Sequence, residues 1–214
     1  MRFDGVHLLL SFLPSLTLAA LPSPQYHLIG YWGQNFASAQ FADSSLQEPS
    51  LKTFCQSTSY TIYHVSFMTL HSDVLGNPAI DFSVHCRWPT NKWSGYPNPD
   101  PRYGFNSLNC RDVGEDVKAC QAMGKKVLIS ISPSDYLTST ESAIRSATGV
   151  WNTFLGGATQ YRPLGDAILD GIDMHIWNND VNGYYTPFVT RLRELMGASL
   201  SKTWYVAGEA TVDA

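Results

Sequence analysis

The chain has 214 residues and a net charge of −4, and 44% of its residues are hydrophobic while 15% are charged. This length and composition are typical of a folded protein with one domain or a little more. The negative charge argues against nucleic acid and anionic membrane surfaces as partners.

The beginning of the chain has the pattern of a secretion signal. One Arg in "MRFDGVH" precedes the apolar run "LLLSFLPSLTLAAL", which is too short to cross a bilayer. The small residues Ala19 and Ala20 offer a cleavage site. We expect residues 1–20 to be removed and residues 21–214 to form a secreted, extracellular protein without a membrane anchor. The alternative is an anchor that is not cleaved.

Four cysteines follow the signal, at positions 55, 86, 110 and 120. Their even number in a secretory context favours disulfide bonds over free thiols. The sequence contains no closely spaced Cys pair of the kind that binds zinc, so we expect neither a metal nor a cofactor. Four cysteines allow three pairings, and their spacing does not choose between them.

Five segments have the composition of buried strands. They are rich in β-branched and aromatic residues and lack a clean alternation of polar and apolar positions, as is typical of a parallel sheet covered on both faces. In chain order they are "HLIGYW" (27–32), "TIYHVSFM" (61–68), "KVLISIS" (126–132), "AILDGIDMHI" (167–176) and "TWYVAG" (203–208).

Apolar residues at helical spacing lie between these strands. We expect helices from three stripes: Val113, Val117, Cys120 and Met123; Ile144, Ala147, Trp151 and Phe154; and Phe188, Leu192 and Leu195 after Pro187. We expect Gly124 to end the first helix, and Thr138, Ser139 or Thr140 to cap the second.

Strands that alternate with helices predict an α/β fold with a parallel sheet. The segment "YWGQNFAS" after the first strand lacks the glycine spacing of nucleotide-binding loops, which argues against a nucleotide-binding open sheet. A (β/α)8 TIM barrel is the natural alternative, although a complete one needs about 250 residues. About five of the eight βα units can be counted before Ala214, so we predict a partial barrel.

The segment 86–110 fits neither a helix nor a strand. It is dense in Pro, Gly, Asn, Trp and Tyr, which predicts a long surface loop, and a Cys stands at each end. Two interpretations remain open for it. The loop is either an aromatic flap that contacts a sugar or an insertion without a role.

The stretch "LDGIDMHIWNND" (169–180) carries the candidate site. Because side chains alternate along a strand, Asp173, His175 and Trp177 share one face with Gly171. In a barrel this face points inward, and the row climbs toward the carboxyl-terminal mouth, where the active sites of barrels lie.

These residues resemble the fourth-strand motif of glycoside hydrolase family 18, and within it the plant- and fungal-type class III chitinases. The motif of this family is D-G-x-D-x-D-x-E. Asp170, Gly171 and Asp173 match it. His175 stands where the family has its last Asp, and Trp177 stands where it has the catalytic Glu.

Other stretches resemble the family in the same order along the chain. "IGYWGQN" (29–35) and "YHVSF" (63–67) look like its first and second strands, which implies that Tyr31, Gln34 and Phe67 bind the sugar. We expect structural roles for Ser130, Asp170 and Gly171, and the cysteine pattern of the family implies the disulfides Cys55–Cys120 and Cys86–Cys110.

The chain also departs from the family. The family's third strand ends in S-x-G-G, where this chain keeps Ser130 but has Ser132 and Pro133 in place of the glycines. Strands six to eight of the barrel are not in the sequence, and they would carry further residues of the cleft.

The resemblance implies a retaining hydrolysis of β-1,4-linked N-acetylglucosamine chains that the substrate itself assists. In it the Glu protonates the departing oxygen, and the last Asp stabilises the acetamido group. Trp177 has no proton to give as a general acid. Asp173 is the one retained inward acid, and we expect His175 to fill barrel space as its hydrogen-bonded partner. Asp180 and Glu209 are expected to be ordinary loop carboxylates.

We therefore expect a catalytically inactive chitinase homologue that binds chitin or a related N-acetylglucosamine oligosaccharide. Trp177 would then serve as a further sugar contact. Two alternatives remain open: an active endo-chitinase that uses an unconventional acid, and a truncated gene product without a stable fold or function.

Overall fold

The computed structural model describes seven ranges of the chain: 27–35, 37–70, 78–86, 110–132, 137–159, 162–175 and 183–208. The predicted signal (1–20) and the interior of the predicted loop (87–109) lie outside these described residues. So do Pro133, Trp177, Asp180 and Glu209.

A six-stranded sheet forms the centre of the described structure. Five strands are parallel and neighbour one another in chain order, and the short strand β3 (Ala79–Ile80) pairs antiparallel with β2. The parallel strands are β1 (Ile29–Trp32), β2 (Ile62–Thr69), β4 (Lys126–Ile131), β5 (Gly171–Met174) and β6 (Tyr205–Gly208). The predicted α/β fold with a partial TIM barrel is confirmed, because neighbouring strands that follow each other in order are the arrangement of a barrel wall.

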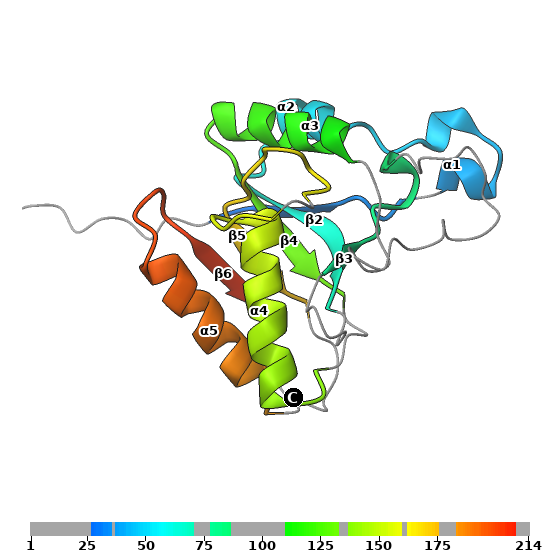
Figure 1. The fold of residues 1–214 in the computed structure, drawn as a ribbon. Coiled ribbons are helices and arrows are strands. Elements are labelled where there is room, and N and C mark those ends of the chain that lie inside the picture. The colour runs from blue at the N-terminus through cyan, green and yellow to red at the C-terminus, as the bar shows by residue number, and fades with distance from the viewer. Residues whose placement is uncertain are drawn as a thin grey trace, which may run out of the picture.

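Helices follow the strands and surround the sheet from outside (Figure 1). Helix α2 packs with α3, and α4 packs with α5. The helices are α1 (Ala37–Gln40), α2 (Leu51–Ser57), α3 (Arg111–Ala122), α4 (Thr140–Phe154) and α5 (Tyr185–Gly197), with 3-10 turns at Ser44–Leu46 and Ser83–His85.

The structure corrects several predicted elements. Helix α2, capped by the Ser50 hydroxyl group, was not predicted, because its seven residues are too few to show a helical stripe. The predicted strand 167–176 is a strand only at Gly171–Met174, since the preceding residues form a loop. Ile144 is 41% exposed and does not belong to the buried stripe of α4. Helix α5 begins before Pro187, which lies in its first turn, where a proline costs no hydrogen bond.

The hydrophobic core lies between the helices and the outer face of the sheet. Tyr63 and Val65 of β2, Val127 and Ile129 of β4, and Ile172 of β5 are all fully buried there. Burial of such side chains stabilises a fold by about 1.5–3 kcal/mol each. This packing leaves the alternate residues of the same strands on the inner face.

The register of the strands sets which inner residues meet. Tyr31 of β1 is paired with His64 of β2. One level further along, Ser66 of β2, Ser130 of β4 and Asp173 of β5 are neighbours across the sheet. Polar side chains from four strands are therefore gathered on the inner face.

Two disulfide bonds join segments that lie outside this sheet. Cys55 of α2 is bonded to Cys120 of α3, and Cys86 is bonded to Cys110 at the start of α3. This is the pairing that the resemblance implies. The second bond closes the predicted loop at its base.

Asp170 ties four elements together at the amino-terminal end of the sheet. Its Oδ2 accepts hydrogen bonds from the Val127 backbone N–H of β4 and from the Gln121 side chain of α3, both at 2.9 Å. Its Oδ1 lies 2.8 Å from the Lys202 ammonium group, which precedes β6. Asp170 is 2% exposed, so these groups replace the water that a carboxylate needs.

Gly171 is required by the close approach of β6. A Cβ atom at this position would collide with the backbone carbonyl group of Tyr205. We predict that Gly171→Ala lowers the free energy of unfolding by about 3 kcal/mol, because backbone of two paired strands has to move. Urea denaturation measures this change.

Gly197→Ala is the matched control, because a Cβ atom at Gly197 in α5 meets no atom within 4 Å. Its effect should stay within about 1 kcal/mol. Equal destabilisation by both substitutions would contradict the close-approach argument.

Candidate functional site

A buried carboxylate, that of Asp173, stands at the centre of the inner face. Its Oδ2 atom accepts hydrogen bonds from the Ser130 hydroxyl group at 2.7 Å and from the Tyr31 hydroxyl group at 2.9 Å. Asp173 is 1% exposed, whereas Tyr31 is 41% exposed and covers it. The carboxylate is thus held by one hydrogen bond from β1 and one from β4, and it is shielded from solvent.

His64 adds a third group to the same oxygen. Its Nδ1 atom lies 3.1 Å from Oδ2 of Asp173, and both side chains are almost fully buried. Among the described residues, neither of its nitrogen atoms has a partner in hydrogen-bonding geometry. The contact with Asp173 is therefore electrostatic. The Ser66 hydroxyl group, two residues further along β2, is also buried without a hydrogen-bonding partner in the part of the chain that the structure describes.

These contacts shift the pKa of Asp173. Burial by itself raises the pKa of a carboxyl group, but the contact with His64 and the hydrogen bonds from Ser130 and Tyr31 lower it by more. The pKa of Asp173 therefore lies below its ordinary value, and the group is ionised at neutral pH. Such a carboxylate does not serve as a proton donor there.

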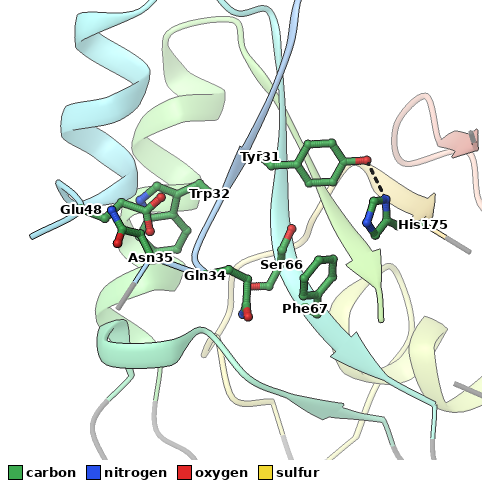
Figure 2. Close-up of a pocket in the computed structure, with 8 residues that line it drawn as sticks. All are labelled: Tyr31, Trp32, Gln34, Asn35, Glu48, Ser66, Phe67 and His175. Atoms are coloured by element: carbon green, nitrogen blue, oxygen red, sulfur yellow. Dashed lines mark hydrogen bonds between the residues drawn. The ribbon is translucent and has the colours of Figure 1, made fainter. Parts of the chain in front are cut away.

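His175 follows β5 and lies against two aromatic rings. The Phe67 ring is stacked on it with centroids 5.4 Å apart, and the Tyr31 hydroxyl oxygen lies 3.4 Å from its Nδ1 atom (Figure 2). The predicted link between His175 and Asp173 thus runs through Tyr31, whose hydroxyl group contacts both. Because that hydroxyl group donates its one proton to Asp173, the contact with His175 is attractive when Nδ1 carries a proton.

A pocket of about 200 Å³ opens beside this cluster. Figure 2 shows Trp32, Asn35 and Glu48 at one end of it, Tyr31, Phe67 and His175 at the other, and Gln34 and Ser66 between them. The predicted sugar-binding residues Tyr31, Gln34 and Phe67 are brought together here, whereas Trp177 lies outside the described residues.

Gln34 connects backbone segments that lie beside the pocket. Its side-chain nitrogen donates to the backbone carbonyl groups of Ser66 at 2.8 Å and Asp81 at 2.7 Å. The amide therefore joins the end of β1 to the end of β2 and to the segment after β3.

Glu48 and His85 are functional candidates that sequence reasoning missed. Oε2 of Glu48 accepts hydrogen bonds from Nε2 of His85 at 2.8 Å and from the Gly33 backbone N–H at 3.0 Å. The Trp32 ring lies over the His85 ring, with centroids 4.2 Å apart. Glu48 lies in a loop and His85 ends a three-residue 3-10 turn, and neither segment has a periodic pattern, so no signal in the sequence pointed to them.

Among the described residues, no cluster of three or more His, Cys, Asp or Glu side chains has the arrangement of a metal site. In the same part of the chain, no helix has the length and apolar character needed to cross a membrane.

Comparison with known proteins identifies the family. The chain is 35% identical over 190 residues to "Chitinase 1" of Rhizopus niveus. The structure superposes on a chitinase from Ipomoea carnea with a TM-score of 0.62 and 30% identity. The chain is a chitinase-like homologue of glycoside hydrolase family 18, class III. It matches no known family profile.

The homology covers most of this chain but only part of its relatives. The match takes in 86% of the chain and 35% of the length of the Rhizopus protein. It takes in 84% of the chain and 57% of the Ipomoea chitinase. The chain thus spans well under two thirds of the length of the family members it matches.

The same fold is found in proteins that are named for functions other than chitin hydrolysis. A xylanase and α-amylase inhibitor protein from Scadoxus multiflorus superposes with a TM-score of 0.62 and 25% identity. The match covers 86% of this chain and 56% of the inhibitor. Membership of this structural group is therefore not by itself a statement about catalysis.

The buried charge of Asp173 predicts a measurable effect on stability. We expect Asp173→Asn to lower the free energy of unfolding by about 3 kcal/mol, because an amide lacks the negative charge that the two hydroxyl groups and the nearby His64 ring stabilise at Oδ2. Because its folded-state pKa is lowered, ionised Asp173 stabilises the fold above about pH 4, and the contribution is lost as the pH falls through that pKa.

Urea denaturation between neutral and acidic pH checks both statements. Asp166→Asn is the control, since Asp166 pairs with Lys118 on the surface and its side chain is 82% exposed. The wild-type protein and this control should lose stability at acidic pH more steeply than Asp173→Asn. An identical pH profile for all three proteins would overturn the assignment.

Proposed function

We propose that this protein is a chitinase-like binding protein that takes up chitin-type oligosaccharides and hydrolyses them negligibly. The observation that carries the proposal is the pair of residues at the working positions of the family motif. His175 and Trp177 stand there in place of an Asp and a Glu.

The missing Glu removes the general acid. Such an acid needs a raised pKa and a proton to donate, and the indole N–H of Trp177 does not ionise usefully. General acid catalysis contributes about 10²–10⁴ to a rate. Asp173 does not replace it, because its pKa is lowered and its Oδ2 atom is occupied by two hydrogen bonds.

The missing Asp removes the second working group. The family resemblance implies that this carboxylate orients and stabilises the acetamido group of the substrate during attack. His175 lacks the negative charge of that carboxylate and is packed between Phe67 and Tyr31 at the wall of the pocket. The loss of a preorganised charge costs further rate.

The pocket itself supports binding. It combines aromatic side chains with polar amide and hydroxyl groups, as ligand-binding pockets do. Relatives at 30% identity or more are named chitinases, which supports a sugar of the chitin type as the ligand. Phe67 and Tyr31 are the aromatic residues that we assign to it.

Secretion belongs to the same proposal. Two disulfide bonds are typical of proteins that mature in an oxidising compartment, and the pattern of residues 1–20 predicts a cleaved signal. An extracellular chitin-type ligand fits this location.

Titration calorimetry with the tetramer of N-acetylglucosamine and a reducing-end assay test the proposal together. We expect saturable binding and a turnover at least about 10²-fold below that of an intact family member. Turnover within about tenfold of that enzyme would favour the active alternative, and a protein that neither binds nor hydrolyses would refute the proposed function.

Phe67→Leu tests the location of the binding site. We expect its affinity for the tetramer to fall about five- to tenfold, because a branched aliphatic side chain cannot present a flat ring to the sugar. Phe41→Leu is the matched control, since Phe41 is 66% exposed and does not line the pocket. Equal affinities of the two variants would place binding elsewhere.

A further inference from the structure

One carboxylate oxygen in the pocket is not used by the fold. Both hydrogen bonds of Glu48 go to Oε2, from His85 and Gly33, and within the described residues Oε1 has no partner. The side chain is 16% exposed and lines the pocket. Glu48 is thus anchored by one oxygen and can accept a hydrogen bond from a ligand with the other.

Glu48 has one basic partner among the described residues, His85, which contacts only its Oε2 atom. The described residues that line the pocket include neither Lys nor Arg. The titratable groups that face it are His85, which donates to its other oxygen, and His175 at the opposite end of the pocket. A second carboxylate, Asp173, lies directly behind Tyr31. This distribution favours a cationic ligand group over a neutral or anionic one.

Aromatic rings complete the environment of such a group. Trp32 lies beside Glu48 at one end of the pocket, and Phe67 and Tyr31 form the other end (Figure 2). Aromatic faces attract ammonium groups, by about 0.5–2 kcal/mol depending on desolvation. A pocket with a carboxylate beside Trp32 and aromatic rings at its far end is therefore a favourable site for an organic ammonium ion.

At the opposite end of the pocket, the carboxylate that the resemblance implies for the acetamido group is replaced by another residue. His175 stands at the motif position where the resemblance implies an Asp that binds that group. A free amino group needs no such partner. When protonated it carries three N–H donors, of which Oε1 of Glu48 can accept one.

We propose that the pocket selects sugar units with a free, protonated amino group, so that its preferred ligand is a glucosamine oligomer, the de-N-acetylated form of chitin. Glu48 is the residue that determines this specificity. The inference rests on the proposed function, because it takes the ligand to be a β-1,4-linked oligosaccharide of the chitin type. The inference adds that the nitrogen atom of the bound sugar unit is a free, protonated amino group.

Titration calorimetry with two ligands, the glucosamine tetramer and the N-acetylglucosamine tetramer, tests the inference at about pH 5.5, where the free amine is protonated. We expect the wild-type protein to bind the glucosamine tetramer at least about tenfold more tightly. Glu48→Gln should remove this difference by weakening binding of the glucosamine tetramer at least about tenfold.

Glu194→Gln is the matched control. Glu194 lies on α5, its side chain is 59% exposed, and the substitution removes the same charge from the protein. The control should retain the preference for the glucosamine tetramer. If both Gln variants weaken its binding equally, the attraction is that of the net charge, and the assignment to Glu48 is wrong.

Asn35→Lys provides a second variant in case Glu48→Gln does not fold. Asn35 is an exposed residue of the pocket, and its contact with the Ala37 backbone N–H is local, so the bonds of Glu48 stay intact. The new ammonium group should weaken binding of the glucosamine tetramer at least about tenfold and that of the N-acetylated tetramer much less.

The outcomes separate the two proposals. Binding of the N-acetylated tetramer with equal or higher affinity refutes the amine preference and leaves the proposed function standing. Absence of binding to either tetramer refutes both. A preference for the glucosamine tetramer that disappears in Glu48→Gln and persists in Glu194→Gln supports both.

Discussion

The buried negative charge of Asp173 is the constraint that organises the inner face of this half-barrel. A carboxylate with 1% exposure has lost its water, so protein groups must replace it. Those groups come from three other strands: Tyr31 from β1, His64 from β2 and Ser130 from β4. They meet one oxygen atom only if the strands keep their parallel register. The charge therefore couples the position of Tyr31, and through it that of His175, to the whole sheet.

Two carboxylates with different surroundings give the site its character. At Asp173 one oxygen receives every contact and the group is shielded, which fits a structural role better than proton transfer. At Glu48, which lines the pocket, one oxygen is anchored by His85 and Gly33 while the other has no partner among the described residues. The first carboxylate holds the strands in place, and the second remains available to a ligand. This arrangement supports the proposed role in sugar binding.

Much of the fold and part of the site could be predicted from the sequence. All five parallel strands were located because their apolar runs are continuous, and β3 was missed because a two-residue strand has no periodicity. Tyr31, Gln34 and Phe67 were identified by motif, and they do line one pocket. His64 and Glu48 were missed, since a histidine in an apolar strand and a glutamate in a loop look ordinary until their neighbours are known.

The sequence by itself determined the fold class, the family and the substitutions at the two working positions of the motif, because strand patterns and the residues at positions 175 and 177 can be read without coordinates. Only the tertiary structure decided which groups share an atom or a cavity. Glu48 and His85 are 37 residues apart, and Tyr31 and Asp173 are 142 apart. Contacts over such separations depend on strand register and loop path, which local sequence does not encode.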